Sequence, residues 1–424
     1  MTQTQFEADG GFSSKPYRSY VLGGLLLLFT FNFIDRILLG IVQEPIKQEF
    51  HLADWQLGLL GGPAFALLYT LLGIPIARLA ETRSRVSIIS ISVALWSAMT
   101  AACGLATGYW QLLAARIGVS IGEAGCTPPA HSLLSDYYPP QQRATALSIY
   151  ALGIPFGSAI AGLGGGWIAD TYSWRHAFWL LGLPGILLAV LTKWTIKEPP
   201  RRGGGEAAPP FAKALMTLLR KPAFTHVAFG GALVSFFGYG AAQFLPSFLI
   251  RSHELSLMQA SLVFAGISAV FVAFGTFLGG ALTDRLIRRD LRAMVWLPAF
   301  GLSLTVPLYL ASYLSTNMVM AFVTLCVGSV LHYTYLGPMY AVTQSVAPPQ
   351  MRATATAVLL FIVNLIGYGL GPPLLGALSD AYAQYFGKSE GLRYALMTDA
   401  CILLWAALHF LLAARTLKRD IVPV

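Results

Sequence analysis

Long apolar runs separated by short polar and charged segments dominate this sequence. The run from Ser87 to Ala115, for example, contains no charged residue. About 20 apolar residues in a helix cross the hydrocarbon core of a bilayer, which is about 30 Å thick. The pattern therefore predicts an all-α membrane protein with twelve transmembrane helices. We expect these helices at roughly 20–44, 55–80, 86–106, 109–136, 142–170, 174–194, 223–250, 258–284, 292–314, 317–346, 351–380 and 392–414.

The composition supports a membrane protein, and the charges indicate its orientation. Hydrophobic residues make up 56% of the 424 positions and charged residues only 11%, whereas soluble domains carry about 25% charged residues. If the N-terminus is cytoplasmic, the cytoplasmic segments hold 21 of the 28 Lys and Arg residues and the opposite side holds five. This asymmetry predicts that both termini are cytoplasmic. It also accounts for the net charge of +9 without nucleic-acid binding.

Three short motifs recur in the second half of the chain in the same order. PPQQRATA, which starts at Pro139, recurs as PPQMRATA at Pro348, an offset of 209 residues. GWIAD at Gly166 and ARLAE at Ala77 have counterparts at offsets of 210 and 203 residues. Motifs at a nearly constant offset indicate a duplicated unit. Because six helices per unit is an even number, the two units are expected to be parallel repeats.

A segment rich in Pro, Gly and charge, from Lys197 to Pro210, separates the two repeats. Such a composition is typical of a flexible linker, and we expect a short amphipathic helix to follow it. The chain is therefore predicted to form two pseudo-symmetric six-helix bundles. The predicted order is a cytoplasmic tail at 1–19, a bundle at 20–196, a cytoplasmic linker at 197–222, a second bundle at 223–414 and a cytoplasmic tail at 415–424.

The loop after the eighth predicted helix carries a family motif. Its sequence GALTDRLIRR, from Gly280 to Arg289, resembles the G-x-L-A-D-R-x-G-R-K signature of the major facilitator superfamily. The resemblance implies the fold of that superfamily and transport by alternating access. It also implies that charges in this loop and in the loop after helix 2 hold an inner gate shut, although they could instead only set the topology. These gating candidates are Glu81, Arg85, Asp284 and Arg285.

Two further segments are similar to the spinster branch of lipid transporters within this superfamily. One is NFIDR, from Asn32 to Arg36 in the first predicted helix, and the other is GEAG, from Gly122 to Gly125 in the fourth. The branch resemblance implies a lipid-like substrate. It also points to Asp35 and Glu123 as titrating residues that share a cavity with arginines.

Four charged residues fall at membrane depth in the first half, and each helix carries its polar residues on one face. Residues at i, i+3 and i+4 lie on the same side of a helix, and residues seven apart lie two turns along one stripe. The candidate residues on helix 1 are Asn32, Asp35 and Arg36, and those on helix 4 are Arg116, Ser120, Glu123 and Thr127.

The acidic members of this set are candidate proton carriers. A charge near the bilayer centre costs several kcal/mol, so such residues normally face a cavity and pair with an opposite charge. Burial raises the pKa of a carboxylate and a nearby arginine lowers it, whereas arginine itself keeps its proton. We therefore predict that Asp35 and Glu123 carry protons, with Arg36 and Arg116 as partners or anion receptors. The alternative is that two ion pairs only hold helices 1 and 4 together.

The second half is poorer in charge at this depth. Shifting Glu123 by 209 residues leads to His332, which could titrate near physiological pH and is a candidate binding residue. The alternative is a hydrogen-bonded structural histidine. Asp399 in helix 12 is a weaker candidate. The remaining expected lining of the second half is aromatic, and the alternative is that these aromatic residues are part of the core. A charged half facing an aromatic half suits an amphiphile with an anionic head.

These features predict a proton-coupled secondary transporter of a lysolipid-like or sphingolipid-like amphiphile in a bacterial-type inner membrane. Small organic anions such as carboxylates are the alternative substrates, and a non-transporting receptor would not need buried titratable pairs. We expect a monomer whose partners are protons, the substrate and membrane lipids. No cofactor or metal ion is expected, since the four cysteines lack metal-ligand spacing. The GVSIG sequence at Gly118 follows no strand and does not indicate an enzyme.

Overall fold

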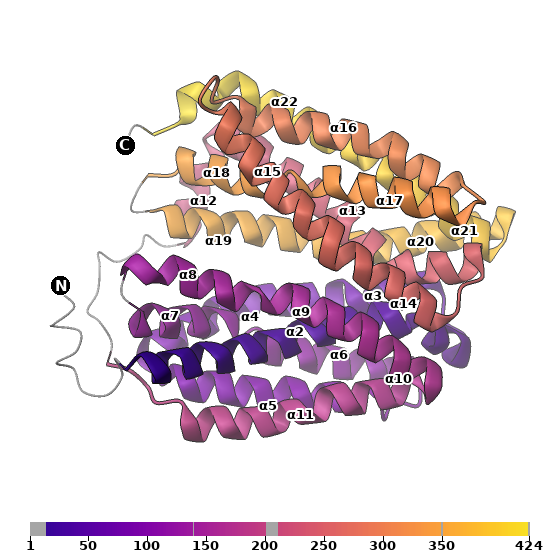
Figure 1. Cartoon of the computed structure of the whole chain (residues 1–424), viewed down its shortest axis with the longest axis horizontal. Coiled ribbons are helices and arrows are strands. Elements are labelled where there is room, and N and C mark those ends of the chain that lie inside the picture. Colours follow the sequence, from indigo (N-terminus) through magenta and orange to yellow (C-terminus); the bar gives the residue numbers. More distant parts are fainter. Residues whose placement is uncertain (1–13, 139, 201–210, 349–350, 423–424) are drawn as a thin grey trace. The chain divides into compact units, whose positions relative to one another are not determined.

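The computed structural model describes residues 14–138, 140–200, 211–348 and 351–422, and the regular structure of these residues is helical (Figure 1). Each of the twelve predicted apolar ranges contains helix. Within the described residues, eleven helices are long and apolar enough to cross a membrane. The remaining predicted range, 109–136, is divided into two shorter helices. The described residues form two units, one of residues 14–50 and 64–200, and one of residues 51–63 and 211–422.

The first unit is a helical bundle with an apolar interior. Its segments are α2 (Lys15–Phe50), α4 (Pro63–Thr82), α5 (Arg85–Cys103), α6 (Tyr109–Glu123), α7 (Thr127–Tyr137), α8 (Pro140–Ala151), α9 (Gly153–Ile160), η1 (Ala161–Gly165), α10 (Gly166–Thr171) and α11 (Trp174–Thr195). Helix α5 packs against α6 and α11, and α2 packs against α9 and α11. The side chains of Trp96, Tyr150 and Phe178 are buried in this interior.

The second unit is a larger bundle of the same kind. Its segments are α3 (Asp54–Gly61), α12 (Phe211–Leu219), α13 (Pro222–His253), α14 (Leu257–Gly266), η2 (Ile267–Val272), α15 (Ala273–Leu286), α16 (Ala293–Leu314), α17 (Met318–Tyr333), α18 (Leu336–Val346), α19 (Arg352–Ile362), η4 (Val363–Tyr368), α20 (Gly369–Phe386), α21 (Lys388–Ala400) and α22 (Ile402–Asp420). Helix α13 packs against α22 and α20, and α16 packs against α17 and α22.

The predicted second helix is divided at Gly62, and its first part, α3, belongs to the second unit. Gly62 has a non-helical ψ of −97°, and Pro63 follows it, which disfavours the α conformation of the preceding residue. Helix α3 packs closely along α20. A Cβ atom on Gly58 would lie 2.4 Å from the Pro372 carbonyl oxygen, and one on Gly376 would lie 2.3 Å from that of Asp54. Glycine at these positions therefore permits the contact.

Polar contacts also fix α3 within the second unit. The Asp54 carboxylate accepts hydrogen bonds from Nη1 and Nη2 of Arg251, at 2.8 and 2.9 Å, and from the Ser379 hydroxyl, at 2.7 Å. The Asp380 carboxylate accepts from the backbone N–H groups of Asp54 and Trp55, at 2.9 and 2.8 Å, and so satisfies donors that the first turn of a helix leaves unpaired. The side chains of Asp54 and Arg251 are 3% and 8% exposed. Bidentate Arg–carboxylate pairs are among the stronger hydrogen-bonded contacts in proteins.

Three of the long helices contain a π-helical segment. Segment η1 lies between α9 and α10, η2 between α14 and α15, and η4 between α19 and α20. Such segments insert a wider turn into an α-helix and occur frequently at functional sites.

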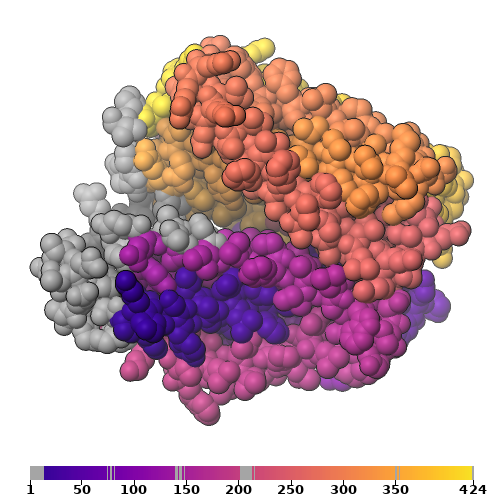
Figure 2. Space-filling view, viewed as in Figure 1, coloured from indigo at the N-terminus to yellow at the C-terminus, as the bar shows by residue number. Residues whose placement is uncertain are grey.

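Large apolar side chains are exposed on several of the long helices. Trp194 of α11 is 80% exposed and Phe277 of α15 is 72% exposed. Helices α14 and α15 lie at the surface in the space-filling view (Figure 2). Soluble monomers rarely expose large apolar patches, so these faces fit a hydrocarbon environment.

Candidate functional site

The four charged side chains predicted at membrane depth form two crossed ion pairs in the first unit. Arg36 Nε of α2 lies 2.7 Å from Glu123 Oε2 of α6. Arg116 Nη1 of α6 lies 3.1 Å from Asp35 Oδ2 of α2. Each helix thus supplies one acid and one arginine. Asp35 and Arg36 can bind different partners because adjacent residues point about 100° apart on a helix.

Both pairs are buried. The side chains of Arg116 and Glu123 are 0% exposed, that of Asp35 is 4% exposed and that of Arg36 is 17% exposed. The Thr100 hydroxyl donates to the second oxygen of Asp35 at 2.7 Å. Removing one partner of a buried pair leaves an uncompensated charge and typically costs about 3–5 kcal/mol. Each carboxylate is therefore closely coupled to its arginine.

Aromatic rings surround the Arg36 guanidinium. Its Cζ lies 5.2 Å from the ring centroid of Phe33, 4.8 Å from that of Phe65 and 4.6 Å from that of Tyr69. Cations over aromatic faces at such distances are stabilised by the ring quadrupole. The Ser120 hydroxyl donates to the Phe65 carbonyl at 2.6 Å and so links α6 to α4 beside the pairs. Arg36 therefore has stabilising contacts besides its carboxylate partner.

Some uncharged or acceptor groups at this site are buried without a hydrogen-bond partner among the described residues. They include the whole side-chain amide of Asn32 and Oε1 of Glu123. Buried polar groups in proteins are normally satisfied by protein or by ordered water. Unsatisfied groups beside two ion pairs therefore mark a place where a proton, a water molecule or a ligand can bind.

The fourth predicted helix is interrupted directly after Glu123, and the sequence explains the interruption. Helix α6 ends at Glu123, and α7 follows after a short turn. Pro128 and Pro129 at the start of α7 have no N–H group to continue the helical hydrogen bonds. In the turn, a Cβ atom on Gly125 would lie 2.0 Å from the Ser92 hydroxyl, so any larger residue would require Ser92 of α5 to move. Glu123 thus lies at a helix end, where the backbone is not locked by a continuous helix.

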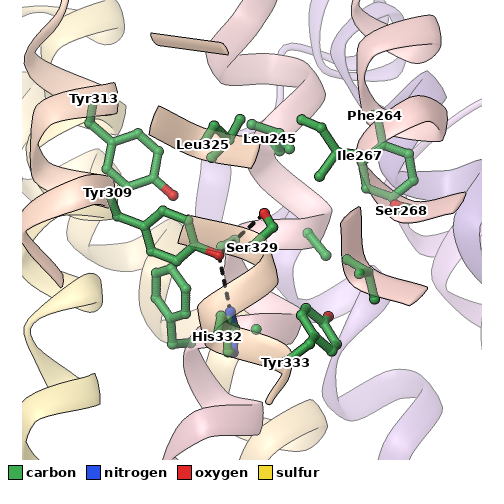
Figure 3. Close-up of a pocket in the computed structure, with 15 residues that line it drawn as sticks. Leu245, Phe264, Ile267, Ser268, Tyr309, Tyr313, Leu325, Ser329, His332 and Tyr333 are labelled. Carbon is green, nitrogen blue, oxygen red and sulfur yellow. Dashed lines mark hydrogen bonds between the residues drawn. The ribbon is translucent and has the colours of Figure 1, made fainter. Parts of the chain in front are cut away.

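The second unit has a matching break. Helix α17 ends at Tyr333, and α18 follows after a short turn. His332, the repeat counterpart of the helix 4 glutamate, is 3% exposed. Its Nδ1 lies 3.2 Å from the Tyr309 hydroxyl, which lies 3.4 Å from the Ser329 hydroxyl (Figure 3). His332 is therefore surrounded by hydroxyl and aromatic groups, and within the described residues it makes no hydrogen bond to an acidic side chain.

A cavity of about 60 Å³ lies beside this histidine, entirely within the second unit (Figure 3). Leu245, Phe264, Ile267 and Leu325 form apolar parts of its wall. Its polar lining is provided by Ser268, Tyr309, Tyr313, Ser329, His332 and Tyr333. The buried ion pairs thus lie in the first unit and the largely aromatic cavity lining lies in the second. This is the contrast between the two halves that the sequence predicted.

Comparisons with known proteins identify the family. A family model described as Major Facilitator Superfamily matches residues 25–372. The chain belongs to this superfamily. It is thus a multi-pass membrane transporter, and the expected resemblance to the spinster branch is confirmed.

Three similar proteins place this transporter within the superfamily. An MFS-type efflux pump of Mycolicibacterium smegmatis is 31% identical over 99% of this chain and 98% of its own length. Protein spinster homolog 1 of Mus musculus is 26% identical over 96% of this chain and 82% of its own length. A crystal structure of a bacterial homologue of the human lysosomal transporter Spinster, inward-facing and unoccupied, matches with a TM-score of 0.90 and 39% identity. That match covers 97% of this chain and 100% of the other.

The gating candidates of this transporter differ in their surroundings. Arg85 is buried and pairs with Asp136 and, at 2.7 Å, with Glu198. Burial would raise the pKa of Glu198, but hydrogen bonds from the Val86 N–H and from the Arg85 and Ser84 side chains lower it below its usual range.

The other gating candidates make fewer contacts. Asp284 and Arg285 are exposed and form no hydrogen bond or ion pair in the part of the chain that the structure describes. The Glu81 side chain lies outside the described residues. Thr127 begins α7 and is partly exposed. The functional roles of all these residues remain predictions.

Sequence reasoning missed two sets of contacts. Asp136 and Glu198 lie 51 and 113 residues from Arg85, and no periodicity links such positions. The Asp54 and Arg251 pair was missed for the same reason. The signal available for each was only a charged residue near the end of an apolar run.

Proposed function

We propose that this protein is a proton-coupled secondary transporter that moves a lipid-like amphiphile across a bacterial-type inner membrane by alternating access. The observation that carries the proposal is the crossed arrangement of two buried carboxylates, each held by an arginine of the other helix. The resemblance to the spinster branch, which implies a lipid-like substrate, supports the substrate class.

Protonation of Glu123 would uncouple it from Arg36. Oε1 of Glu123 has no hydrogen bond in the described residues, so it can accept the proton while Oε2 still faces Arg36. The neutral acid binds the guanidinium more weakly, because hydrogen bonds between ionised groups are roughly twice as strong as neutral ones. Arg36 keeps its ring contacts and becomes available to an anionic head group. Asp35 and Arg116 form the second such switch.

Small organic anions are the second candidate substrates. The Phe65 ring centroid lies 4.8 Å from Cζ of Arg36 and 5.8 Å from Cζ of Arg116. Two guanidinium groups beside one ring could bind one carboxylate between them once Asp35 and Glu123 are protonated. A preference for short carboxylates over lysolipids would favour this candidate.

Alternating access also requires α3 to change its contacts. The Asp54 hydrogen bonds and the close glycine contacts hold α3 in the second unit, although the rest of helix 2 lies in the first. In the opposite conformation, we propose that α3 leaves α20 and that Asp54 separates from Arg251. The ion pair would then stabilise only one of the two conformations.

The proposed topology has twelve spans, with α6 and α7 together forming one of them, and both termini in the cytoplasm. The repeat supports bundles at 20–196 and 223–414. In this conformation residues 51–63, which belong to the first range, pack with the second unit. We propose that the transporter works as a monomer, that Asp284, Arg285, Glu81 and Arg85 belong to the inner gate, and that His332 contacts the substrate.

A direct test uses purified protein in proteoliposomes that contain a pH-sensitive dye. Lysolipids and short carboxylates are added one at a time, and the substrate-dependent pH change is recorded. We expect a pH change with anionic lysolipids that is absent in empty liposomes and in the Glu123→Gln variant. Glu254→Gln makes the same chemical change at an exposed position and should behave as the wild type. A pH change that persists in Glu123→Gln would refute the coupling role, and a response only to carboxylates would refute the substrate class.

A further inference from the structure

Asp399 is a buried carboxyl group of the second unit that the proposed coupling site does not use. It lies near the end of α21, and its side chain is 3% exposed. Neither of its oxygens has a hydrogen-bond partner in the described residues. A Cβ atom on Gly240 of α13 would lie 3.3 Å from Asp399 Oδ2, 3.3 Å from a Leu375 methyl group and 3.4 Å from the Gly371 carbonyl carbon. The carboxyl group therefore lies where α13, α20 and α21 come together.

Within the described residues, neither oxygen of Asp399 is hydrogen-bonded to a basic group. Helices α13, α16, α20 and α22 pack against α21. On these helices, Tyr313 of α16 is an ionisable residue that interacts electrostatically with Asp399. Other ionisable groups of these helices have contacts elsewhere. These contacts include Arg251 with Asp54, His253 with the Phe248 ring, Asp380 with the first turn of α3, Tyr382 with Thr398, His409 with His226 and, on α21 itself, Arg393 with Glu390.

This isolation distinguishes Asp399 from Asp35 and Glu123, which both pair with arginine. An ionised carboxylate without a partner in an apolar interior is so unfavourable that the group instead becomes neutral. A metal ion would need several oxygen or nitrogen ligands, and no group of three acidic, His or Cys side chains suited to a metal occurs among the described residues. The ligand that fits this site is a proton.

A partly polar cavity of the same unit includes a neighbour of Asp399 in its wall. Tyr313, the electrostatic neighbour of Asp399, lines the cavity of about 60 Å³ beside His332 (Figure 3). A water molecule needs about 10–15 Å³ of such volume together with polar partners, so the cavity has room for several. The hydroxyl groups of Tyr309 and Ser329 continue the polar lining to His332.

We propose that Asp399 is a second proton-binding site, located in the second unit and separate from the ion pairs of the first. In this conformation one carboxylate oxygen holds a proton, and the side chain is a neutral carboxylic acid. Release of the proton requires a conformation in which α13, α20 and α21 no longer enclose the group. The inference does not depend on the proposed substrate or on the role of Glu123.

Infrared spectroscopy of the full-length protein in lipid nanodiscs tests this proposal. Aspartate labelled with ¹³C at its side-chain carboxyl group separates the carbonyl stretch of protonated aspartic acid from those of glutamic acid and lipid esters. We expect a labelled band of protonated aspartic acid at pH 7 in the wild type and its loss in Asp399→Asn. Asp170→Asn, at an exposed position of the first unit, should keep the band.

Asp399→Glu gives an independent readout, because the proton then resides on an unlabelled glutamate and the labelled band should again be lost. Absence of the band from the wild type at pH 7 would overturn the proposal without any variant. Retention of the band in both Asp399 variants would assign the proton to another aspartate and would equally overturn it.

Discussion

Replacement of Asp54 by Asn should shift the transporter away from the conformation described above. The change removes the charge that neutralises Arg251, whose side chain is 8% exposed. Leaving one partner of a buried pair uncompensated costs about 3 kcal/mol at the lower end of measured values. Since 1.4 kcal/mol corresponds to a factor of ten, this conformation should lose about a hundredfold in population relative to the opposite one. A 99:1 distribution would become nearly even.

Spin labels can report this shift within the second unit. Trp55 of α3 and Tyr385 of α20 are 43% and 81% exposed, so cysteines at these positions can be labelled after the exposed Cys401 has been replaced by Ser. We expect one short distance in the wild type and a second, longer one in Asp54→Asn.

Two controls show whether the charge is responsible. Ser379→Ala removes one hydrogen bond to the Asp54 carboxylate but leaves the ion pair in place. Such a bond is worth about 1.5 kcal/mol at the lower end of measured values, so the shift should be only about tenfold. The double variant Asp54→Arg with Arg251→Asp should restore part of the short-distance population. The reasoning is refuted if Asp54→Asn keeps the wild-type distance distribution while the protein remains folded.

Three further predictions concern the first unit and the linker. Asp35→Asn should mimic the protonated state and remove most of the pH dependence of spin-label distances between α2 and α13, whereas Arg36→Ala should mainly reduce substrate transport. If the distances in Asp35→Asn remain as pH-sensitive as in the wild type, Asp35 is not a switch. A cysteine at Gly204, in the predicted linker, should react with impermeant reagents only from the cytoplasmic side, and labelling from outside intact cells would contradict the topology. Glu198→Gln should lower the melting temperature at pH 7. Because the pKa of Glu198 is lowered in the folded state, its contribution is fully present above about pH 4.3 and is lost as the pH falls through the folded-state pKa, so the melting temperatures of the variant and the wild type should converge on acidification.

The positions of the helices could be predicted from the sequence because a membrane requires long apolar segments. The candidate charges could be identified for a related reason, since Asp35, Arg36, Arg116 and Glu123 interrupt segments that are otherwise uncharged. Their pairing could not be predicted. It depends on how α2 and α6 are rotated about their axes, and the sequence alone permits Asp35 to face either arginine.

Other features depend on packing between distant segments. The transfer of α3 to the second unit follows from glycine contacts with α20, for which the chain has no local signal, whereas the division itself coincides with the Gly62–Pro63 pair. Asp399 shows the same limit in another form. Its acidic side chain was visible in the sequence, but the lack of a cationic neighbour emerges only when α13, α16 and α20 are placed around it.

The π-helical segments have a consequence for the register of the helices that contain them. A shift of 203 residues takes Gly62 to position 265, two residues before η2 begins. A shift of 209 residues takes η4 back to 154–159, which ends two residues before η1 begins. The irregularities therefore recur at nearly equivalent points of the two repeats. A π turn holds one residue more than an α turn, and that residue rotates everything beyond it by about 100°. A single-residue deletion, which would misalign any regular helix, can here be absorbed by conversion of the π turn to an α turn. These are accordingly the points at which the transmembrane helices can change length without unfolding.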